Sequence, residues 1–466
     1  MDKFWFKTLS IFLISIIYLS PTSVVTAQET PPSGPVYIVQ EGDSLWEIAY
    51  RFHVSQDELA NENGIINSDQ IRVGQQLVIP GLEGIQGILT TQPVLYGENL
   101  QSLSVLYQIS PQALQRLNHI TSPNELYAGY SLVVPQNDTS TTQDKRVNLY
   151  TGQSILELAI LNNTDPWRVM VTNGIGNTWS VLPGEVLRLP GEEDTGPGAL
   201  PPAISSVNIT GLTQGETAEV QVNGDAGLTI KGSLNERNLN FFYDTTKQYI
   251  ALQGVHAMAA PGLYPLNLQV NTSEGTLHDF SQMVLVQAGD FPYDRTLPVD
   301  PATLDPETNR LENELWSTSS SAVTPNKEWN GNLFVPVDPA FAECYSSRFG
   351  NRRSYNGGEY LYFHTGLDFC GQVGDPIYAA ASGVVVFADT LTVRGKATMI
   401  DHGWGVYTAY MHQSEIYVSV GEHVDKGQLI GLVGNTGRVE GPHLHFEVLV
   451  GGVQVNPLDW LNREFP

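Results

Sequence analysis

The feature that most constrains the fold is a threefold repeat in the N-terminal part of the chain. Two glycines, an asparagine and a proline recur every 55 residues, as Gly42, Asn63, Gly74 and Pro80, then Gly97, Asn118, Gly129 and Pro135, then Gly152, Asn173, Gly184 and Pro190. Three copies without an insertion or a deletion are hard to obtain by chance. A repeat of this length is typical of one small supersecondary unit, so we expect three modules with the same fold.

The first copy contains signals for two strands and two short helices. An apolar start at residues 37–39 meets Gly42-Asp43-Ser44-Leu45-Trp46, in which the Asp-Ser pair can cap a helix. A second helical patch ends before Asn63, and residues 73–80 close the copy as a strand. This copy resembles a lysin motif, the βααβ module that holds N-acetylglucosamine glycans. The resemblance implies glycan contacts at Gly42, Asp43, Ser44, Leu45 and Asn63.

Copies two and three depart from the first copy at the start of the first helix. They read Gly97-Glu98-Asn99-Leu100 and Gly152-Gln153-Ser154-Ile155, without the Asp-Ser pair. We therefore interpret residues 37–80 as a lysin motif, and residues 93–135 and 147–190 as degenerate lysin motifs. The fold is expected in all three, whereas copies two and three either bind glycan or act as spacers that bind nothing.

A second constraint lies near the C-terminus, where the chain reads Gly-Pro-His-Leu-His-Phe-Glu from residue 441 to residue 447. On an extended strand alternate side chains share a face, so His443 and His445 point the same way, roughly 7 Å apart. Upstream, His364 and Asp368 supply an imidazole and a carboxylate. A nitrogen, nitrogen and oxygen set with one position left for water suits catalytic zinc better than calcium or magnesium, which prefer oxygen ligands. The sequence therefore predicts a zinc site.

At these residues the chain resembles the lysostaphin-type (LytM-like) zinc endopeptidases of bacterial cell walls. The signature of that family is His-x-x-x-Asp, then a histidine after a Tyr-rich strand, then His-x-His preceded by Gly-Pro. Its elements occur here in order as His364 with Asp368, His412, and His443 with His445. The resemblance covers about residues 333–462 and implies a mostly antiparallel β domain with a groove. It implies metal ligation by His364, Asp368 and His445, and catalytic roles for His412 and His443, although sequence alone does not distinguish the two histidines of the last pair.

The middle of the chain has the pattern of a small β-sandwich followed by a spacer. Short alternating runs separated by Gly, Asn and Asp turns fill residues 203–288. The sequence Ala260-Pro261-Gly262-Leu263-Tyr264-Pro265 looks like the immunoglobulin-like module that precedes the peptidase in some relatives. Residues 289–332 contain one predicted helix, with Asp305 as N-cap, Pro306 at the first helical position, and Leu311, Leu315 and Trp316 on one face. Nothing in this spacer suggests chemistry.

Charge and the first residues predict an exported protein. The chain has 23 basic and 49 acidic residues, a net charge of −26, which argues against nucleic acid or an anionic membrane surface as a partner. Residues 1–27 combine Lys3 and Lys7 with an apolar run at residues 9–19 and a small-residue end, as in a secretory signal. We expect cleavage after Ala27, with an uncleaved anchor as the alternative. No other stretch is apolar enough to cross a membrane.

The sequence has two cysteines, Cys344 and Cys370. An even pair in an exported chain is a candidate for a disulfide. A zinc role is the alternative, and it is weaker because the histidine and aspartate set already fills three positions.

Together these features predict a secreted zinc endopeptidase of the cell envelope. It would hydrolyse peptide cross-links of peptidoglycan and hold the N-acetylglucosamine glycan through its lysin motifs. One alternative is a catalytically silent regulator of cell-wall amidases, since some relatives keep the fold and lose zinc ligands. The presence of His364, Asp368 and His445 disfavours it. A second alternative, a glycan-binding scaffold, leaves the predicted metal site unexplained.

Overall fold

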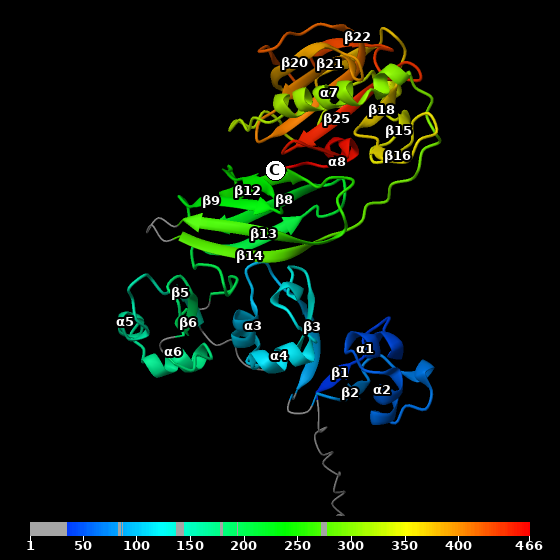
Figure 1. The fold of residues 1–466 in the computed structure, drawn as a ribbon. Coiled ribbons are helices and arrows are strands. Elements are labelled where there is room, and N and C mark those ends of the chain that lie inside the picture. Colours follow the sequence, from blue (N-terminus) through cyan, green and yellow to red (C-terminus); the bar gives the residue numbers. More distant parts are fainter. Residues whose placement is uncertain are drawn as a thin grey trace, which may run out of the picture.

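The computed structural model describes residues 35–82, 85, 87–136, 144–177, 180–192, 194–271 and 277–466. Figure 1 shows small helical modules at the N-terminal end, a pair of sheets in the middle, and a larger sheet-rich domain that carries the C-terminus. The expected signal sequence at residues 1–27 lies outside the described residues. In the part of the chain that the structure describes, every helix is too short or too polar to span a membrane.

Each of the three repeats folds in the predicted order of strand, helix, helix and strand. The elements are β1 (Val36–Ile38), α1 (Leu45–Arg51), α2 (Gln56–Glu62) and β2 (Gln76–Val78); β3 (Ile88–Pro93), α3 (Leu100–Tyr107), α4 (Pro111–Leu117) and β4 (Ser131–Gln136); and β5 (Asp144–Asn148), α5 (Ile155–Leu161), α6 (Pro166–Thr172) and β6 (Val186–Pro190). The first two repeats share one sheet, in the order β2-β1-β3-β4, because β1 and β3 pair in parallel. In the third repeat β5 pairs with β6.

The first helix of each repeat begins at a capping residue. Ser44 Oγ accepts a hydrogen bond from the amide of Glu47 at 3.2 Å, and the Glu47 carboxylate accepts one from the amide of Ser44 at 2.9 Å. This reciprocal pair satisfies two amides at the start of α1. Asn99 and Ser154 cap α3 and α5. The two copies without the Asp-Ser pair therefore keep the group that starts the helix.

The repeated asparagine joins the second helix of each module to its last strand. Asn63 Nδ2 donates to the carbonyls of Leu59 at 2.9 Å and Val78 at 2.8 Å, and Asn63 Oδ1 accepts from the amide of Val78 at 2.7 Å. The same contacts recur for Asn118 with Leu114 and Val133, and for Asn173 with Val169 and Arg188. The asparagine side chain thus gives the amide and carbonyl of the last strand the hydrogen bonds that a neighbouring strand would otherwise supply. This explains why asparagine recurs at this position.

The middle of the chain consists of two four-stranded antiparallel sheets. Their orders are β10-β9-β13-β14 and β11-β12-β8-β7. The strands are β7 (Ile204–Thr210), β8 (Thr217–Gly224), β9 (Thr229–Leu234), β10 (Arg237–Asn240), β11 (Phe242–Tyr243), β12 (Gln248–Gly254), β13 (Gly262–Asn271) and β14 (Leu277–Val286). Alternating apolar side chains of both sheets, among them Val220, Val222, Leu266 and Leu268, form one buried cluster. This arrangement follows from the alternating pattern in the sequence.

The spacer contains the predicted helix, α7 (Pro306–Ser319), with Asp305 as its N-cap. The predicted buried face is wrong in part. Leu311 and Leu315 are 51% and 43% exposed, and the side chains buried on this helix are those of Glu312 and Trp316. The surface of the neighbouring domain therefore decides which face of the helix is buried. That domain offers hydrogen-bond partners to the side chains of Glu312 and Trp316.

The C-terminal domain is built around one large, mostly antiparallel sheet, as predicted. Its main path runs β15-β18-β25-β22-β21-β20-β23, with β19, β24 and β26 attached at its sides. The elements are β15 (Tyr345–Ser347), β16 (Arg352–Arg353), β17 (Tyr362–Phe363), β18 (Leu367–Cys370), β19 (Pro376–Tyr378), β20 (Gly383–Leu391), β21 (Gly395–Asp401), β22 (Val406–Ile416), β23 (His423–Val424), β24 (Leu429–Val433), β25 (His443–Val450), β26 (Val453–Val455) and α8 (Pro457–Asn462).

Two further contacts hold this domain together and against its neighbour. Cys344 and Cys370 form a disulfide, with Cα atoms 5.4 Å apart, which ties the segment before β15 to the end of β18. Trp460 Nε1 donates to Thr217 Oγ1 at 2.9 Å, so α8 is bonded to the middle domain. The end of the chain therefore packs on the two-sheet domain.

A buried histidine lies in the core of the C-terminal sheet. The ring nitrogens of His402 lie 2.6 Å from the carbonyl of Ser382 and 2.7 Å from Thr408 Oγ1. Burial lowers the pKa of His402 to about 4, although the hydrogen bond to Ser382 acts in the opposite direction. The imidazole is therefore neutral in the folded protein at pH 7.

Replacing the repeated asparagine should loosen the last strand of a module. In Asn63→Ala the partly buried amide and carbonyl of Val78 lose their partners, which we expect to cost about 1–3 kcal/mol of module stability. Hydrogen exchange at the amides of β2 measures this loss. Asn61→Ala, on the exposed side of α2, is the matched control. Equal protection of β2 in the two variants would show that the asparagine does not hold the strand.

The second prediction concerns acid stability and His402. Because the folded-state pKa of about 4 lies below the unfolded value of 6.5, the unfolded chain takes up this proton first as the pH falls. The stability contribution is complete above pH 6.5 and is lost toward pH 4. We expect the stability advantage of the wild type over His402→Gln to shrink by roughly 3 kcal/mol across this range. Denaturant unfolding at several pH values measures it, with exposed His423→Gln as the control. A constant difference would contradict the prediction.

Candidate metal centre and active site

Strand pairing brings the predicted metal ligands together. In the antiparallel ladder of β18 and β25, Asp368 lies opposite His445. His364 comes from the turn that leads into β18, and this turn passes very close to β25. A Cβ on Gly366 would lie 2.4 Å from the carbonyl oxygen of Phe446 and 2.8 Å from His445 Nε2. Glycine at this position therefore allows the approach of the two segments.

The three side chains form a tight and buried cluster. His364 Nε2 lies 2.9 Å from Asp368 Oδ1 and 2.9 Å from His445 Nδ1, and His445 Nδ1 lies 2.7 Å from Asp368 Oδ1. All three residues are at most 6% exposed. Among the described residues these atoms form a group with the spacing that a metal ion requires.

The hydrogen bonds around the cluster orient its nitrogen atoms. His364 Nδ1 donates to the carbonyl of Arg348 at 2.8 Å, and His445 Nε2 donates to Glu447 Oε1 at 3.3 Å. His364 Nε2 and His445 Nδ1 are then the nitrogen atoms that face each other and a carboxylate oxygen. Three such atoms repel one another unless a cation lies among them, so the donor set fits a metal ion.

The electrostatics of the cluster also favour positive charge. Burial acts to lower the pKa of His445, but its hydrogen bonds to Asp368 and Glu447 outweigh this effect and raise the pKa to about 9. Burial acts to raise the pKa of Asp368, but attraction to His364 and the hydrogen bonds of both imidazoles hold it well below its usual range. The site therefore keeps its carboxylate ionised and stabilises a cation beside it.

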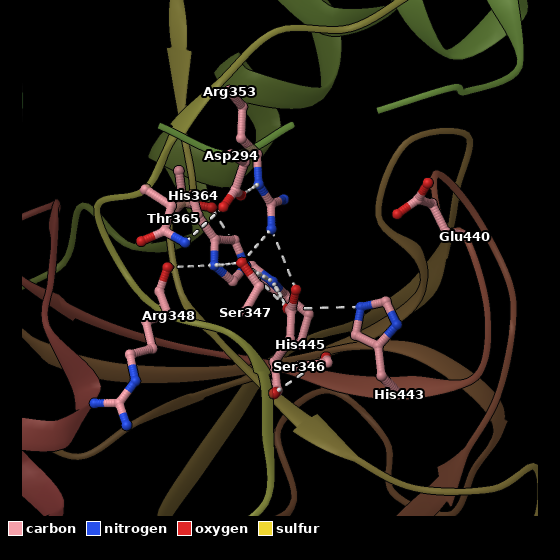
Figure 2. A network of polar contacts seen from close by, with 12 residues as sticks. Asp294, Ser346, Ser347, Arg348, Arg353, His364, Thr365, Glu440, His443 and His445 are labelled. Atoms are coloured by element: carbon pink, nitrogen blue, oxygen red, sulfur yellow. Dashed lines mark hydrogen bonds and ion pairs between the residues drawn. The ribbon is translucent and has the colours of Figure 1, made fainter. Parts of the chain in front are cut away.

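A partly buried arginine supports the carboxylate from the other side. Arg353 Nη2 lies 3.3 Å from Asp368 Oδ2 and 3.0 Å from Ser347 Oγ, and Arg353 Nε lies 3.4 Å from Asp294 Oδ2. Figure 2 shows Arg353 reaching toward the histidine cluster with Asp294 beside it. Sequence reasoning missed Arg353 and Asp294, because both reach the site only through tertiary packing. It also missed the role of Glu447, although this residue lies two positions after His445 and therefore on the same strand face.

The two predicted catalytic histidines flank the cluster. His412 Nδ1 donates to the carbonyl of Thr436 at 2.8 Å, and His443 Nδ1 donates to that of Gly441 at 2.8 Å. Their rings lie 4.9 Å apart, and His443 Nε2 is 3.5 Å from Asp368 Oδ1. Burial and the neighbouring His443 hold the pKa of His412 well below its usual range. His412 is therefore a neutral imidazole whose Nε2 can accept a proton.

The cluster opens into a groove of about 910 Å³. The groove is lined by both histidines, by spacer and α7 residues such as Asp294 and Asn313, and by His256 of the middle domain. Its rim carries an exposed ion pair, Arg295 with Glu440 at 3.0 Å. The groove thus has the access that a peptide substrate needs, and its walls come from three parts of the chain.

The predicted glycan residues of the first module all serve its own fold. Asp43 accepts from Tyr37 Oη at 2.7 Å and pairs with Arg51 at 3.1 Å, while Leu45 is 1% exposed. Ser44 caps α1, and Asn63 binds β2, as described above. Gly42 has a φ of +88°. Ser44 is exposed, so a ligand at this turn would meet its side chain together with backbone groups.

Two exposed aromatic side chains of the same module were missed from the sequence. Trp46 and Tyr50, one helical turn apart on α1, are 59% and 70% exposed. Their rings stack with centroids 5.4 Å apart. Only the spacing of four residues could have indicated this pair.

Comparison with known proteins relates both ends of the chain to known families. Residues 362–457 match the model of Peptidase family M23, and residues 37–80 and 94–135 match that of the LysM domain. Peptidoglycan DD-endopeptidase ShyA of Vibrio cholerae is 42% identical over 123 residues, which cover 26% of this chain and 28% of that protein. DD-carboxypeptidase/endopeptidase Mpg of Neisseria meningitidis is 44% identical over 95 residues, or 20% of this chain and 22% of that protein.

A solved structure from Pseudomonas aeruginosa described as a peptidase M23 has a TM-score of 0.43 at 25% identity, covering 54% of this chain and 96% of that one. The matches to the two curated relatives span less than a third of those proteins. The comparisons thus relate the C-terminal part of the chain to Peptidase family M23 and its N-terminal part to LysM domains.

Proposed function

We propose that the protein is an exported, zinc-dependent endopeptidase that hydrolyses peptide cross-links of peptidoglycan. The observation that carries this proposal is the buried cluster of His364, Asp368 and His445 at the floor of an open groove. The match to Peptidase family M23 over the same residues supports it. Relatives named DD-endopeptidase support a DD cross-link as the first substrate to test.

Zinc is the proposed metal because the donors are two imidazole nitrogens and one carboxylate oxygen. Three protein ligands leave a position for water or substrate, as in catalytic zinc sites. When bound, zinc polarises a carbonyl and lowers the pKa of water toward about 7.

The residues around the cluster have different proposed roles in peptide hydrolysis. In the neutral form of each ring, donation from Nδ1 to the backbone carbonyl leaves Nε2 of His412 and of His443 able to accept a proton. We assign to them the uptake of the proton from the attacking water and hydrogen bonding to the developing oxyanion. Arg353 and Glu447 hold the ligands Asp368 and His445 in place.

The remaining domains are proposed to retain the enzyme on peptidoglycan and to separate its glycan-binding modules from the peptidase domain. The LysM matches support binding of the first two modules to N-acetylglucosamine glycan. In the first module, the turn at Gly42, Asp43, Ser44 and Leu45 would make the contact through its backbone and the exposed Ser44 side chain. We propose that the two-sheet domain is immunoglobulin-like, on the basis of its paired antiparallel sheets. Action on peptidoglycan and the expected signal sequence both support a location outside the cytoplasm.

Three histidine variants test the assignment of roles. We expect His445→Ala to lose both zinc and activity, because it removes a ligand. His412→Ala and His443→Ala should keep zinc and lose turnover by roughly 100-fold or more, the usual scale for a general acid or base. Elemental analysis and hydrolysis of cross-linked muropeptides, with and without a chelator, measure both quantities. Exposed His423→Ala is the control. Zinc lost from His443→Ala but kept by His445→Ala would reverse the assignment.

Glycan retention is tested with the full-length His412→Ala variant, in which hydrolysis of the sacculi is slowed. We expect it to sediment with insoluble sacculi and to be released by soluble oligomers of N-acetylglucosamine, because these compete for the LysM modules. A cross-linked peptide without sugar should release much less protein. The opposite order of release would place the main binding energy in the groove and contradict the retention role.

A further inference from the structure

Helix α7 lies outside the residues that match Peptidase family M23, yet it inserts two side chains into that domain. Glu312 and Trp316 are one turn apart and are 6% and 2% exposed. The Glu312 carboxylate accepts from the amide of Val393 at 2.8 Å, just before β21. The Trp316 ring packs on Phe387 of β20, with centroids 5.5 Å apart. Figure 1 shows α7 lying along these strands. The helix is thus fixed to the sheet at two positions that lie one helical turn apart.

The indole of Trp316 reaches the row of groups behind the metal cluster. Its Nε1 donates to Glu447 Oε2 at 3.1 Å, and the Arg394 guanidinium lies 4.7 Å from the ring. Glu447 is 1% exposed, and its other oxygen, Oε1, accepts from His445 Nε2 at 3.3 Å. A continuous buried path therefore runs from an indole N–H through one carboxylate to a metal-binding imidazole.

This path fixes the orientation of both Glu447 and His445. A carboxylate with one oxygen bound by an indole cannot rotate freely, so its second oxygen stays opposite His445 Nε2. With Nε2 held at Glu447, Nδ1 is the nitrogen that faces His364 and Asp368. Partners of this kind set the tautomer and ring angle of metal-binding histidines, and their loss typically lowers metal affinity 10–100-fold.

We infer that Trp316 of α7 is a positioning residue for the metal ligand His445, acting through Glu447. This inference rests on the proposed function insofar as His445 is a zinc ligand. It makes the spacer helix part of the metal centre. Trp316 thereby contributes to the reaction although its side chain is not among those that line the groove.

The test is zinc affinity of the full-length protein, measured by competition with a chromogenic chelator. Trp316→Phe keeps an aromatic ring in the core and removes the N–H, and we expect affinity to fall by about 10-fold or more. Trp329→Phe is the matched control, because Trp329 is 4% exposed in the same domain and donates at 3.4 Å to the carbonyl of Phe465. It should bind zinc as the wild type does.

A double-mutant cycle separates action through Glu447 from general loosening of the core. If Trp316 acts through Glu447, the double variant Trp316→Phe with Glu447→Gln should bind zinc no more weakly than Glu447→Gln alone. Additive losses, unchanged affinity in Trp316→Phe, or an equal fall in Trp329→Phe would overturn the inference. If the wild type and His445→Ala bound zinc equally, the proposed function itself would fail, which is a different result.

A measurement on the unmodified protein keeps the test independent of mutant folding. With tryptophan indoles labelled with ¹⁵N, addition of zinc should shift the Nε1–H resonance of Trp316, since its acceptor Glu447 also binds His445. The resonance of Trp329 should remain in place. Equal responses of the two indoles would contradict a path from Trp316 to the metal centre.

Discussion

The pairing of β18 with β25 is the contact on which the candidate metal centre depends. It places Asp368 opposite His445, residues 77 positions apart in the chain. A slip of one residue in this ladder would turn one of the two side chains to the other face of the sheet. The same ladder pairs Cys370 with His443, and Cys370 is bonded to Cys344. The register that builds the donor set is therefore also the register that the disulfide ties to the neighbouring segment.

Much of the metal site could be predicted because its ligands lie in short motifs with fixed spacing. His364 with Asp368, and His443 with His445, are each joined by local geometry of turn or strand. The supporting groups had no such signal. Arg353 reaches Asp368 only through the tertiary fold of the domain. Asp294 of the spacer pairs with Arg353, and Trp316 reaches Glu447 from a helix in that spacer. A motif thus indicates which residues bind, whereas tertiary packing decides what orients them.

The fold was predictable where a residue pattern repeats along the chain. It was less predictable where the buried side of one element depends on the surface against which that element packs. The three modules follow from recurring positions, and the middle sheets follow from alternation of apolar residues. On α7, however, the apolar residues Leu311 and Leu315 stay exposed while Glu312 is buried. A stripe of apolar residues on a helix predicts only which side of the helix avoids water. Here the domain beneath the helix presents backbone amides that a carboxylate satisfies, and this overrides the apolar pattern.

The shared sheet of the first two modules changes how their binding energies combine. Modules on a flexible tether search for their sites separately, and the tether sets their effective concentration. The parallel pairing of β1 with β3 joins these two modules through backbone hydrogen bonds, so they cannot reorient independently. If both modules bind glycan as proposed, their fixed separation selects among glycan strands: both sites on one strand would be engaged only if the sugar repeat matched the distance between the modules, and any other strand would be held by one module at a time.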